Sequence, residues 1–288
     1  MGVAPINRRL EGQAAYLFFK RRQISNCVFC GKSPVTKEHT WSRWLRRHIR
    51  RRMTKWETFK ATEHRTEIES GVKVRPGDPH DWQISCVCSK CNNGWMSQIE
   101  KRVRPVLGPL AEGVPFRVTE QDQSILAIWC ILKTMVAEFD DPERVTTHHM
   151  QRKRMCRRQL APSKGWRVWI GHFDRDAWAP YYIINTLSIL PGPPPLNGAN
   201  VAVKRYNTQS VTQIVGKLFI HVIHSPYREL VSRWVFPVPV QGKLRQIWPL
   251  TGYSFVWPPD PMTDGIADAA AQAFFAFCRD GVARQRSD

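Results

Sequence analysis

The stretches that decide the fold are residues 27–30 (CVFC) and 88–91 (CSKC), two Cys-x-x-Cys pairs separated by a long excursion of the chain. Each pair lets two thiolates from one tight turn bind the same metal ion. Two such pairs supply the four sulfur ligands of a structural Zn²⁺ site and leave no position for a substrate. We therefore predict a structural zinc ion with the ligands Cys27, Cys30, Cys88 and Cys91.

Two alternatives to this ligand set follow from the same residues. The four thiols could be unrelated core cysteines, and Cys86 could replace Cys88 because it lies just before it. The tight turn of a Cys-x-x-Cys pair favours Cys88. The other four of the eight cysteines are scattered, which fits a reducing compartment better than a disulfide framework, so we expect no disulfide bonds.

The chain is strongly basic, with 43 Lys and Arg against 24 Asp and Glu and a formal net charge of +19. The excess is concentrated in residues 1–104, which hold 22 basic and 9 acidic side chains. Such a field attracts polyanions, of which nucleic acid is the commonest, and we expect DNA as the partner. A membrane surface and simple solubility are the alternative explanations.

The composition predicts a packed globular protein, because 42% of the residues are hydrophobic and twelve are tryptophan. The sequence contains no run of eighteen apolar residues and no signal-peptide pattern. We therefore expect no membrane association and a cytoplasmic location.

Residues 41–56 (WSRWLRRHIRRRMTKW) have the period of an amphipathic helix. One face is apolar, and the opposite face carries arginines with no interleaved acid. Such a face is expected to contact phosphate, with an ordinary solvated helix as the alternative. The predicted nucleic-acid-binding residues are Arg43, Arg46, Arg47, Arg50 and Arg51.

The pattern around the cysteines predicts strands at residues 36–40 and 81–87, and a helix that opens at residues 92–94 and ends at Pro105. Residues 57–80 resemble a hairpin around Ser70-Gly71 or a flexible insertion. A short helix at residues 10–23 is expected to pack over the zinc module.

The second half of the chain has a mixed pattern. Thr119 caps a predicted helix of residues 119–139, and a basic helix is predicted at residues 142–160. The remaining predictions are strands at residues 166–173, 181–190, 201–206, 217–223 and 231–240, and a final helix at residues 263–279. The predicted fold class is therefore α+β, with domains at residues 1–109 and 110–288.

The order Cys-x-x-Cys, Glu38-His39, Cys-x-x-Cys-Asn92 resembles the zinc-bearing branch of the HNH endonucleases, the ββα-metal nucleases, over about residues 24–104. Residues 90–100 (KCNNGWMSQIE) also look like the helix opening of many bacterial and phage HNH-like proteins. The resemblance implies an N-terminal, zinc-stapled ββα-metal module that cuts phosphodiester bonds.

The resemblance also implies roles for particular residues. His39 would be the general base, and Glu38 and Asn92 would bind a catalytic Mg²⁺ or Mn²⁺. A neutral imidazole can accept a proton from water, and hard oxygen ligands leave Mg²⁺ with open positions for phosphate. Asn92 could instead be only a helix N-cap, with Asn93 as the ligand.

One position departs from the family pattern. Members often carry an asparagine about five residues before the third cysteine that orients the histidine, and here Gln83 stands at that place. Gln83, with its longer side chain, or the nearby His80 could make the same hydrogen bond.

The resulting expectation is a metal-dependent DNA endonuclease whose residues 110–288 position substrate, recognise a partner or regulate cutting. One alternative is a non-catalytic zinc-dependent nucleic-acid-binding module. Another is an interaction protein of a defence or mobile-element system that holds a gated nuclease. A protein partner or a homo-oligomer, formed through the C-terminal domain, is also considered.

Overall fold

The computed structural model describes residues 24–49, 55–64, 67–78, 81–157, 162–173, 180–189 and 206–284. Several sequence predictions lie outside these ranges. They are the helix of residues 10–23, the strand of residues 201–206 apart from its last residue, and the positions of Arg50, Arg51 and His80.

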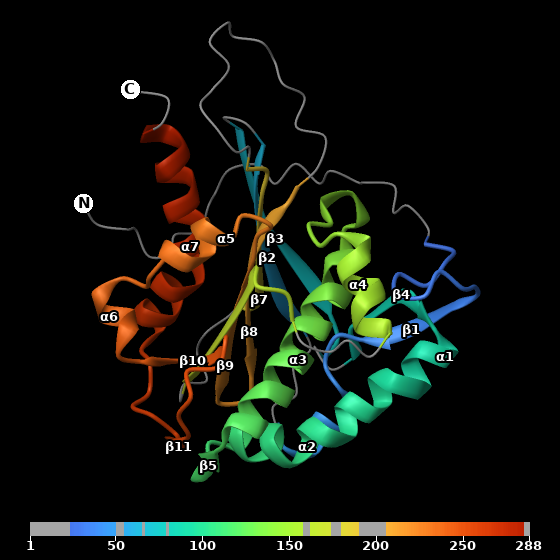
Figure 1. The fold of residues 1–288 in the computed structure, drawn as a ribbon, viewed down its shortest axis with the longest axis horizontal. Helices are drawn as coiled ribbons and strands as arrows, with labels where there is room; N and C mark the ends of the chain where they lie inside the picture. Colours follow the sequence, from blue (N-terminus) through green and yellow to red (C-terminus); the bar gives the residue numbers. More distant parts are fainter. Residues whose placement is uncertain are drawn as a thin grey trace, which may run out of the picture.

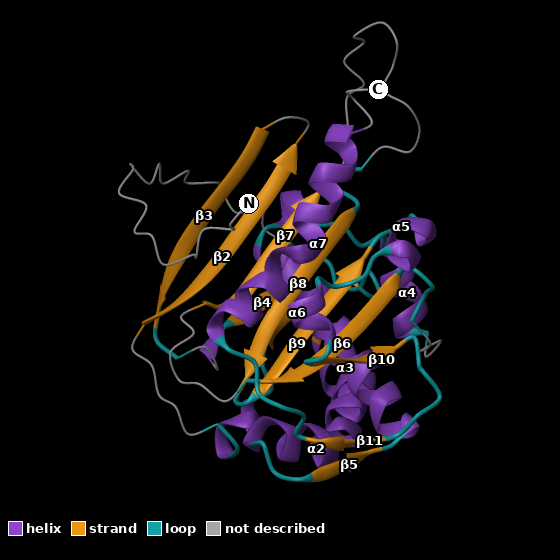
Figure 2. Ribbon diagram, turned by 90° about the vertical axis from the view of Figure 1, so that its left-hand side faces the viewer, coloured by secondary structure: helices purple, strands orange, loops and turns teal. Residues whose placement is uncertain are grey.

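A seven-stranded sheet forms the centre of the molecule (Figure 2). All neighbouring strands are antiparallel except β2 and β7, which run parallel. The central strands β8 and β9 are buried along their whole length, as expected for a sheet covered on both faces. In sheet order the strands are β10 (Leu244–Trp248), β6 (Trp166–His172), β9 (Leu218–His224), β8 (Thr208–Val215), β7 (Pro180–Leu187), β2 (Lys55–His64) and β3 (Glu67–Pro76).

Helices cover both faces of this sheet (Figure 1). On one face lies α7 (Asp264–Arg284), accompanied by the short helices α5 (Arg228–Arg233) and α6 (Val238–Gln241). On the other face lies α3 (Glu120–Ala137), which contacts β6, β9 and β10. Each face of the sheet has its own hydrophobic core. The fold combines helices and strands and is therefore of the mixed α and β class, as predicted.

Helix α3 is the central helix of the molecule and begins where the sequence predicts. Thr119 and Asp122 form a reciprocal capping box at its N-terminus. Its side chains are buried almost all round, from Ile125 to Ala137, and a 3-10 turn (Glu138–Asp140) follows. A helix buried on all sides has few polar positions, which gives Lys133 in its last third an unusual environment.

A two-stranded antiparallel sheet of β1 (Val35–His39) and β4 (Gln83–Cys88) carries four of the predicted site residues, Glu38, His39, Gln83 and Cys88. Val35 pairs with Cys88 at one end of this hairpin, and His39 pairs with Gln83 at the other. After β4 the chain continues through α1 (Ser89–Cys91), a π-helical turn η3 (Asn92–Met96) and α2 (Ser97–Glu112). The predicted strand–strand–helix order is therefore present.

The predicted end of the helix at Pro105 is wrong, because Pro105 and Pro109 both lie inside α2. The helix continues to Gly113, whose left-handed φ of 71° terminates it. The apolar face from Ile99 to Leu110 is buried, and this packing outweighs the backbone hydrogen bonds that the prolines remove. The predicted domain limit at residues 109 and 110 falls inside this helix, and the two-domain division stays a prediction.

The segment between the two cysteine pairs forms a hairpin, but not around Ser70-Gly71. Strands β2 and β3 pair from Lys55↔Pro76 to His64↔Glu67, so the connection follows His64, and Gly71 pairs with Lys60 within the ladder. Strand β2 also pairs with β7. The insertion therefore supplies two strands of the central sheet.

The long amphipathic helix predicted at residues 41–56 is wrong. Among the described residues 41–49 only a five-residue 3-10 helix, η1 (Arg43–Arg47), forms, and the chain is in β2 at Lys55. Trp41 and Leu45 are buried in the core, so the apolar part of the pattern reflects burial of a short turn. Residues 55 and 56 pair with β3, so the predicted helix does not include them.

Other differences concern the second half of the chain. Residues 231–240 are not a strand: their buried apolar side chains belong to the end of α5, to α6 and to the link between them, and Pro237 and Pro239 disfavour pairing. The basic helix is confined to α4 (His149–Cys156), with a 3-10 turn η5 (Pro142–Arg144) before it. Strands β8, β10 and the small pair β5 (Phe116–Val118) and β11 (Phe255–Trp257) were not predicted.

The turn between β8 and β9 packs closely on the end of α2, and a substitution there tests this contact. Gly216 has a φ of 61°, and an added Cβ would lie 2.3 Å from the Ala111 carbonyl oxygen. We expect Gly216→Ala to lower the free energy of unfolding by at least about 2 kcal/mol, measured by denaturant titration.

The matched control is Gly242→Ala, because Gly242 has a φ of −73° and open space around the added methyl group. We expect its free energy of unfolding to change by no more than about 0.5 kcal/mol. Equal stability of the two variants would contradict the close approach at Gly216.

Candidate metal centre and neighbouring histidine

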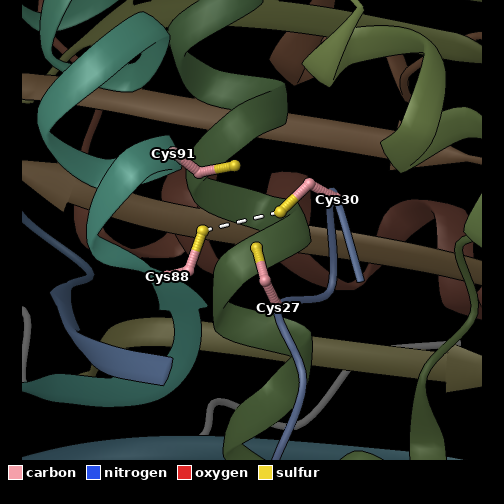
Figure 3. Close-up of side chains that lie close together, drawn as sticks. All are labelled: Cys27, Cys30, Cys88 and Cys91. Carbon is pink, nitrogen blue, oxygen red and sulfur yellow. Dashed lines mark hydrogen bonds between the residues drawn. The ribbon is translucent and has the colours of Figure 1, made fainter. Parts of the chain in front are cut away.

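The two cysteine pairs come together in space, as predicted (Figure 3). Their four Sγ atoms all lie within 4.8 Å of one another, and the Sγ atoms of Cys30 and Cys88 are 3.5 Å apart. Cys27 and Cys30 come from the turn before β1, Cys88 ends β4, and Cys91 ends α1.

A tight turn sets the first pair. The backbone N–H of Gly31 donates to the Cys27 carbonyl at 2.8 Å, and Gly31 has a φ of 78°, which favours glycine. The backbone N–H of Val28 donates to the Cys86 carbonyl at 2.9 Å, which joins this turn to β4. The second pair is placed by the strand-to-helix junction at Cys88.

The four thiols fit a zinc ion. With Zn–S bonds of about 2.3 Å, tetrahedral geometry places sulfur atoms about 3.8 Å apart, and the observed separations agree with this range. Burial raises the pKa of Cys88, but hydrogen bonds from the backbone of Cys91 and from neighbouring thiols lower it to about 7. Burial raises the pKa of Cys30 and of Cys91, whose protons a bound ion would displace. The convergence of the four thiols is what allows the cluster to hold a metal ion such as zinc.

Two further cysteines lie near this cluster. Cys86 is fully buried, and burial raises the pKa of its thiol, so it is a core residue and not one of the clustered thiols. Cys156 of α4 has its Sγ 4.0 Å from that of Cys91. Cys156 lies 65 residues after Cys91 in the sequence and outside any ligand spacing, so the sequence did not indicate this contact.

Arg152 attaches the first cysteine turn to the rest of the molecule. Its Nε donates to the Val28 carbonyl at 3.3 Å, and one terminal nitrogen donates to the Thr147 carbonyl at 2.5 Å. The same guanidinium lies 3.7 Å from a carboxylate oxygen of Glu138. The basic pattern of residues 142–160 therefore includes at least one structural arginine, which sequence reasoning did not separate from the exposed ones.

His39 and Gln83 meet at the open end of the β1–β4 hairpin. The side-chain Nε2 atoms of the two residues are 2.6 Å apart. Burial, the largest effect, lowers the pKa of His39, Glu38 opposes this shift, and Arg43 and Lys133 add to it. The imidazole is therefore neutral near pH 7, and Gln83 occupies the place expected of the residue that orients it.

Glu38 is held by a buried lysine. The Nζ atom of Lys133 lies 2.8 Å from Glu38 Oε1, 2.8 Å from Glu100 Oε1 and 3.0 Å from the His39 carbonyl oxygen. Lys133 is 1% exposed and Glu38 is 6% exposed. The ammonium has three N–H donors, and each has an acceptor in this arrangement.

Glu100 gathers the other donors of this network. The indole N–H groups of Trp44 and Trp129 donate to it at 2.9 and 3.1 Å, and the Ser42 hydroxyl also donates. Burial raises the pKa of Glu100, but the ammonium of Lys133 and these hydrogen bonds lower it overall. Burial likewise opposes the charge on Lys133, and the two carboxylates raise the pKa of the lysine above its usual range.

The surroundings of Glu38 do not fit the Mg²⁺ or Mn²⁺ site that the resemblance implies. A divalent ion at Glu38 Oε1 would face a fixed ammonium that already contacts the same oxygen, in a region with little water to screen the repulsion. Asn92 is partly exposed at the start of η3, and no hydrogen bond among the described residues joins it to Glu38, His39 or Gln83. Glu100, about two helical turns beyond Asn92, is joined to Glu38 because both carboxylates contact Lys133.

The predicted phosphate-binding arginines are only partly described. Arg43, Arg46 and Arg47 are exposed on η1, and Arg46 forms an ion pair with Asp81. The exposed Arg104 of α2 places its guanidinium 5.1 Å from the ring centre of Trp44. Arg104 of α2 therefore lies against Trp44 of η1, the turn that carries the exposed arginines.

Comparison of the chain with protein-family models, curated proteins and solved structures finds no match. The likeness to HNH endonucleases therefore stays a resemblance of motif order and spacing. Among the described residues, no helix combines the length and the apolar character needed to cross a bilayer.

The cysteine cluster makes a prediction about metal content. We expect one zinc ion per chain in the purified protein, measured by inductively coupled plasma mass spectrometry. Cys88→Ala removes a thiolate ligand, so we expect it to lose the zinc and to unfold at a markedly lower temperature.

Cys86→Ala is the matched control, because it removes a buried thiol from the same strand that is not one of the four clustered sulfurs. We expect this variant to keep its zinc. Loss of zinc from both variants to the same degree would contradict the ligand set.

Proposed function

We propose that the protein is an endonuclease that hydrolyses phosphodiester bonds of DNA, with His39 as the general base. The observation that carries this proposal is the contact of His39 with Gln83 at the end of the hairpin whose other end is closed by the cysteine cluster. The same residues carry the resemblance to HNH endonucleases, and the basic surface beside them suits a phosphate backbone.

The proposed chemistry needs His39 to be neutral and to have one nitrogen available. The carboxamide nitrogen of Gln83 faces His39 Nε2, so it donates to that atom and the proton of the neutral ring is on Nδ1. The proposed chemistry requires the carboxamide to flip, so that Nε2–H donates to the Gln83 oxygen and Nδ1 keeps its lone pair. Water then gives a proton to Nδ1 while its oxygen bonds to phosphorus, the bond from phosphorus to the 3′ oxygen breaks, and the departing 3′ alkoxide takes a proton from solvent water. A bound zinc ion would hold the turn and the strand end in place and take no part in this step.

The exposed arginines are the proposed contacts with the DNA backbone. Arg43 and Arg47 are exposed on η1, only a few residues from His39 in the chain. Phosphate contacts of this kind position a substrate without reading its sequence. They support DNA binding whether or not the bound strand is cut.

The second candidate is a non-catalytic zinc-dependent nucleic-acid-binding module. The ion pair between Glu38 and Lys133 favours it, because that carboxylate is the one that the resemblance assigns to the catalytic cation. No step of the proposed hydrolysis uses a cation at Glu38. The divalent-metal dependence of cutting stays a prediction for the assay below.

Cleavage of supercoiled plasmid by the purified full chain, with Mg²⁺ or Mn²⁺ added, tests the first proposal. We expect nicked or linear product, and we expect His39→Ala to slow its formation at least about 100-fold because the general base is lost. Gln83→Ala should slow it less. His148→Ala, which removes an exposed imidazole at the start of α4, should cut like the wild type.

Equal rates for the wild type and His39→Ala would remove the nuclease assignment. No cutting by either protein, together with tight DNA binding, would favour the second candidate. Zinc content and circular dichroism of each variant would show that loss of activity is not loss of the fold.

DNA binding itself depends on the basic face of η1. We expect the double variant Arg43→Ala and Arg47→Ala to weaken binding to duplex DNA and to reduce the slope of log K against log salt by about 2. Fluorescence anisotropy over a range of salt concentrations measures both quantities.

The matched control changes the same number of charges elsewhere, with Arg228→Ala and Arg233→Ala on α5. We expect it to leave the salt slope unchanged. An equal loss in both double variants would mean that only net charge matters and that η1 is not the contact.

A further inference from the structure

The contacts of Lys133 have the form of a coordination shell around a cation. Two carboxylate oxygens, from Glu38 and Glu100, and one carbonyl oxygen, from His39, surround its Nζ atom at 2.8–3.0 Å. The oxygens come from β1 and α2, whereas the lysine comes from α3, so three elements meet at one buried positive charge.

Hard oxygen donors of this kind also bind Mg²⁺ and Mn²⁺. The Ser42 hydroxyl lies against the same carboxylate of Glu100, which adds a further oxygen next to the group. Without the lysine, two buried carboxylates would repel each other with no compensating charge. The structure thus places an ammonium where the charge balance requires a cation.

We propose that the ammonium of Lys133 permanently occupies the cation position formed by Glu38, Glu100 and the His39 carbonyl, and that the protein binds no divalent cation at Glu38. This inference goes beyond the proposed function, because it concerns which cation these oxygens hold and does not require the protein to cut DNA. If the protein does cut, a divalent cation used in cutting is held without Glu38.

A divalent cation at Glu38 and the ammonium of Lys133 exclude each other because the two positions are close together and buried. A divalent ion bound to Glu38 Oε1 would lie within a few ångströms of the ammonium, and both charges would be shielded from water. The lysine cannot move away easily, because its side chain is buried between α3 and the neighbouring elements and all three of its N–H donors have acceptors. Loss of the lysine charge is therefore the change that would open the position.

The experiment measures Mn²⁺ binding to the zinc-loaded full chain, by isothermal titration calorimetry and by the electron paramagnetic resonance signal of free Mn²⁺. We expect wild type and Glu38→Gln to bind Mn²⁺ alike, because Glu38 takes no part. We expect Lys133→Met to gain one Mn²⁺ site at least about 100-fold tighter than any in the wild type. Adding Glu38→Gln to Lys133→Met should abolish the new site.

Lys133→Arg is the matched control, because it keeps a positive charge between the two carboxylates and should gain no Mn²⁺ site. Should Lys133→Met not fold, Lys133→Met combined with Glu100→Gln leaves one buried carboxylate in place of two, and a Mn²⁺ site that depends on Glu38 is expected there. Zinc content and circular dichroism identify the variants that are folded.

Two results would overturn the inference. One is a wild-type Mn²⁺ site that Glu38→Gln removes, because Glu38 would then hold a divalent ion beside Lys133. The other is a folded Lys133→Met protein that gains no site, because the oxygens would then not form a cation position. Neither result depends on cleavage, so failure here is distinguishable from failure of the nuclease proposal.

Discussion

The buried ammonium of Lys133 is the interaction that joins the motif-bearing hairpin to the rest of the molecule. Through Glu38, the His39 carbonyl and Glu100 it connects β1 and α2 to α3, and the indoles of Trp44 and Trp129 complete the network. Removing one partner of such a group leaves an uncompensated buried charge, which costs about 3–5 kcal/mol. The position of His39 therefore depends on Lys133, a residue 94 positions later in the chain.

The hairpin is held at both ends by different chemistry. At the Val35 and Cys88 end, four thiols converge and Arg152 donates to the first cysteine turn. At the His39 and Gln83 end, Lys133 holds β1 through its contacts with Glu38 and the His39 carbonyl oxygen. The segment that connects the two cysteine pairs is itself part of the central sheet, so the hairpin is also held by the pairing of β2 with β7.

Local patterns predicted the features that depend on local geometry. The Cys-x-x-Cys spacing predicted the sulfur cluster, and the Thr119 cap predicted the start of α3. Alternation predicted β4, and strand-forming residues bounded by turn signals predicted β1, β6, β7 and β9. The position of Gln83 relative to the third cysteine also led us to expect its contact with His39, whereas its role in orienting the ring stays a prediction. The role of Asn92 as a metal ligand stays a prediction.

Features that depend on distant partners could not be read in the same way. Strand β8 contains Gln209, Thr212 and Gln213, which look solvent-exposed in sequence but are buried between two helical layers. Lys133 interrupts an apolar helix, and nothing nearby in sequence indicates that its partners are 95 and 33 residues away, at Glu38 and Glu100. Pairing of β2 with β7 is a long-range contact that periodicity does not encode.

The net charge of the cluster formed by Lys133, Glu38 and Glu100 bears on both candidate functions. Two carboxylates and one ammonium leave a net charge of −1 in a region that packing closes to water, and the neighbouring indole and hydroxyl donors stabilise that charge. A network satisfied in this way gains nothing from a metal ion, and its value is the rigidity it gives to the backbone at His39. Rigid support of a histidine is useful to a hydrolase, whereas a pure binding surface has no need of it. The Gln83 contact on the imidazole points the same way, and for this reason we propose the nuclease as the first candidate although Glu38 is paired with Lys133.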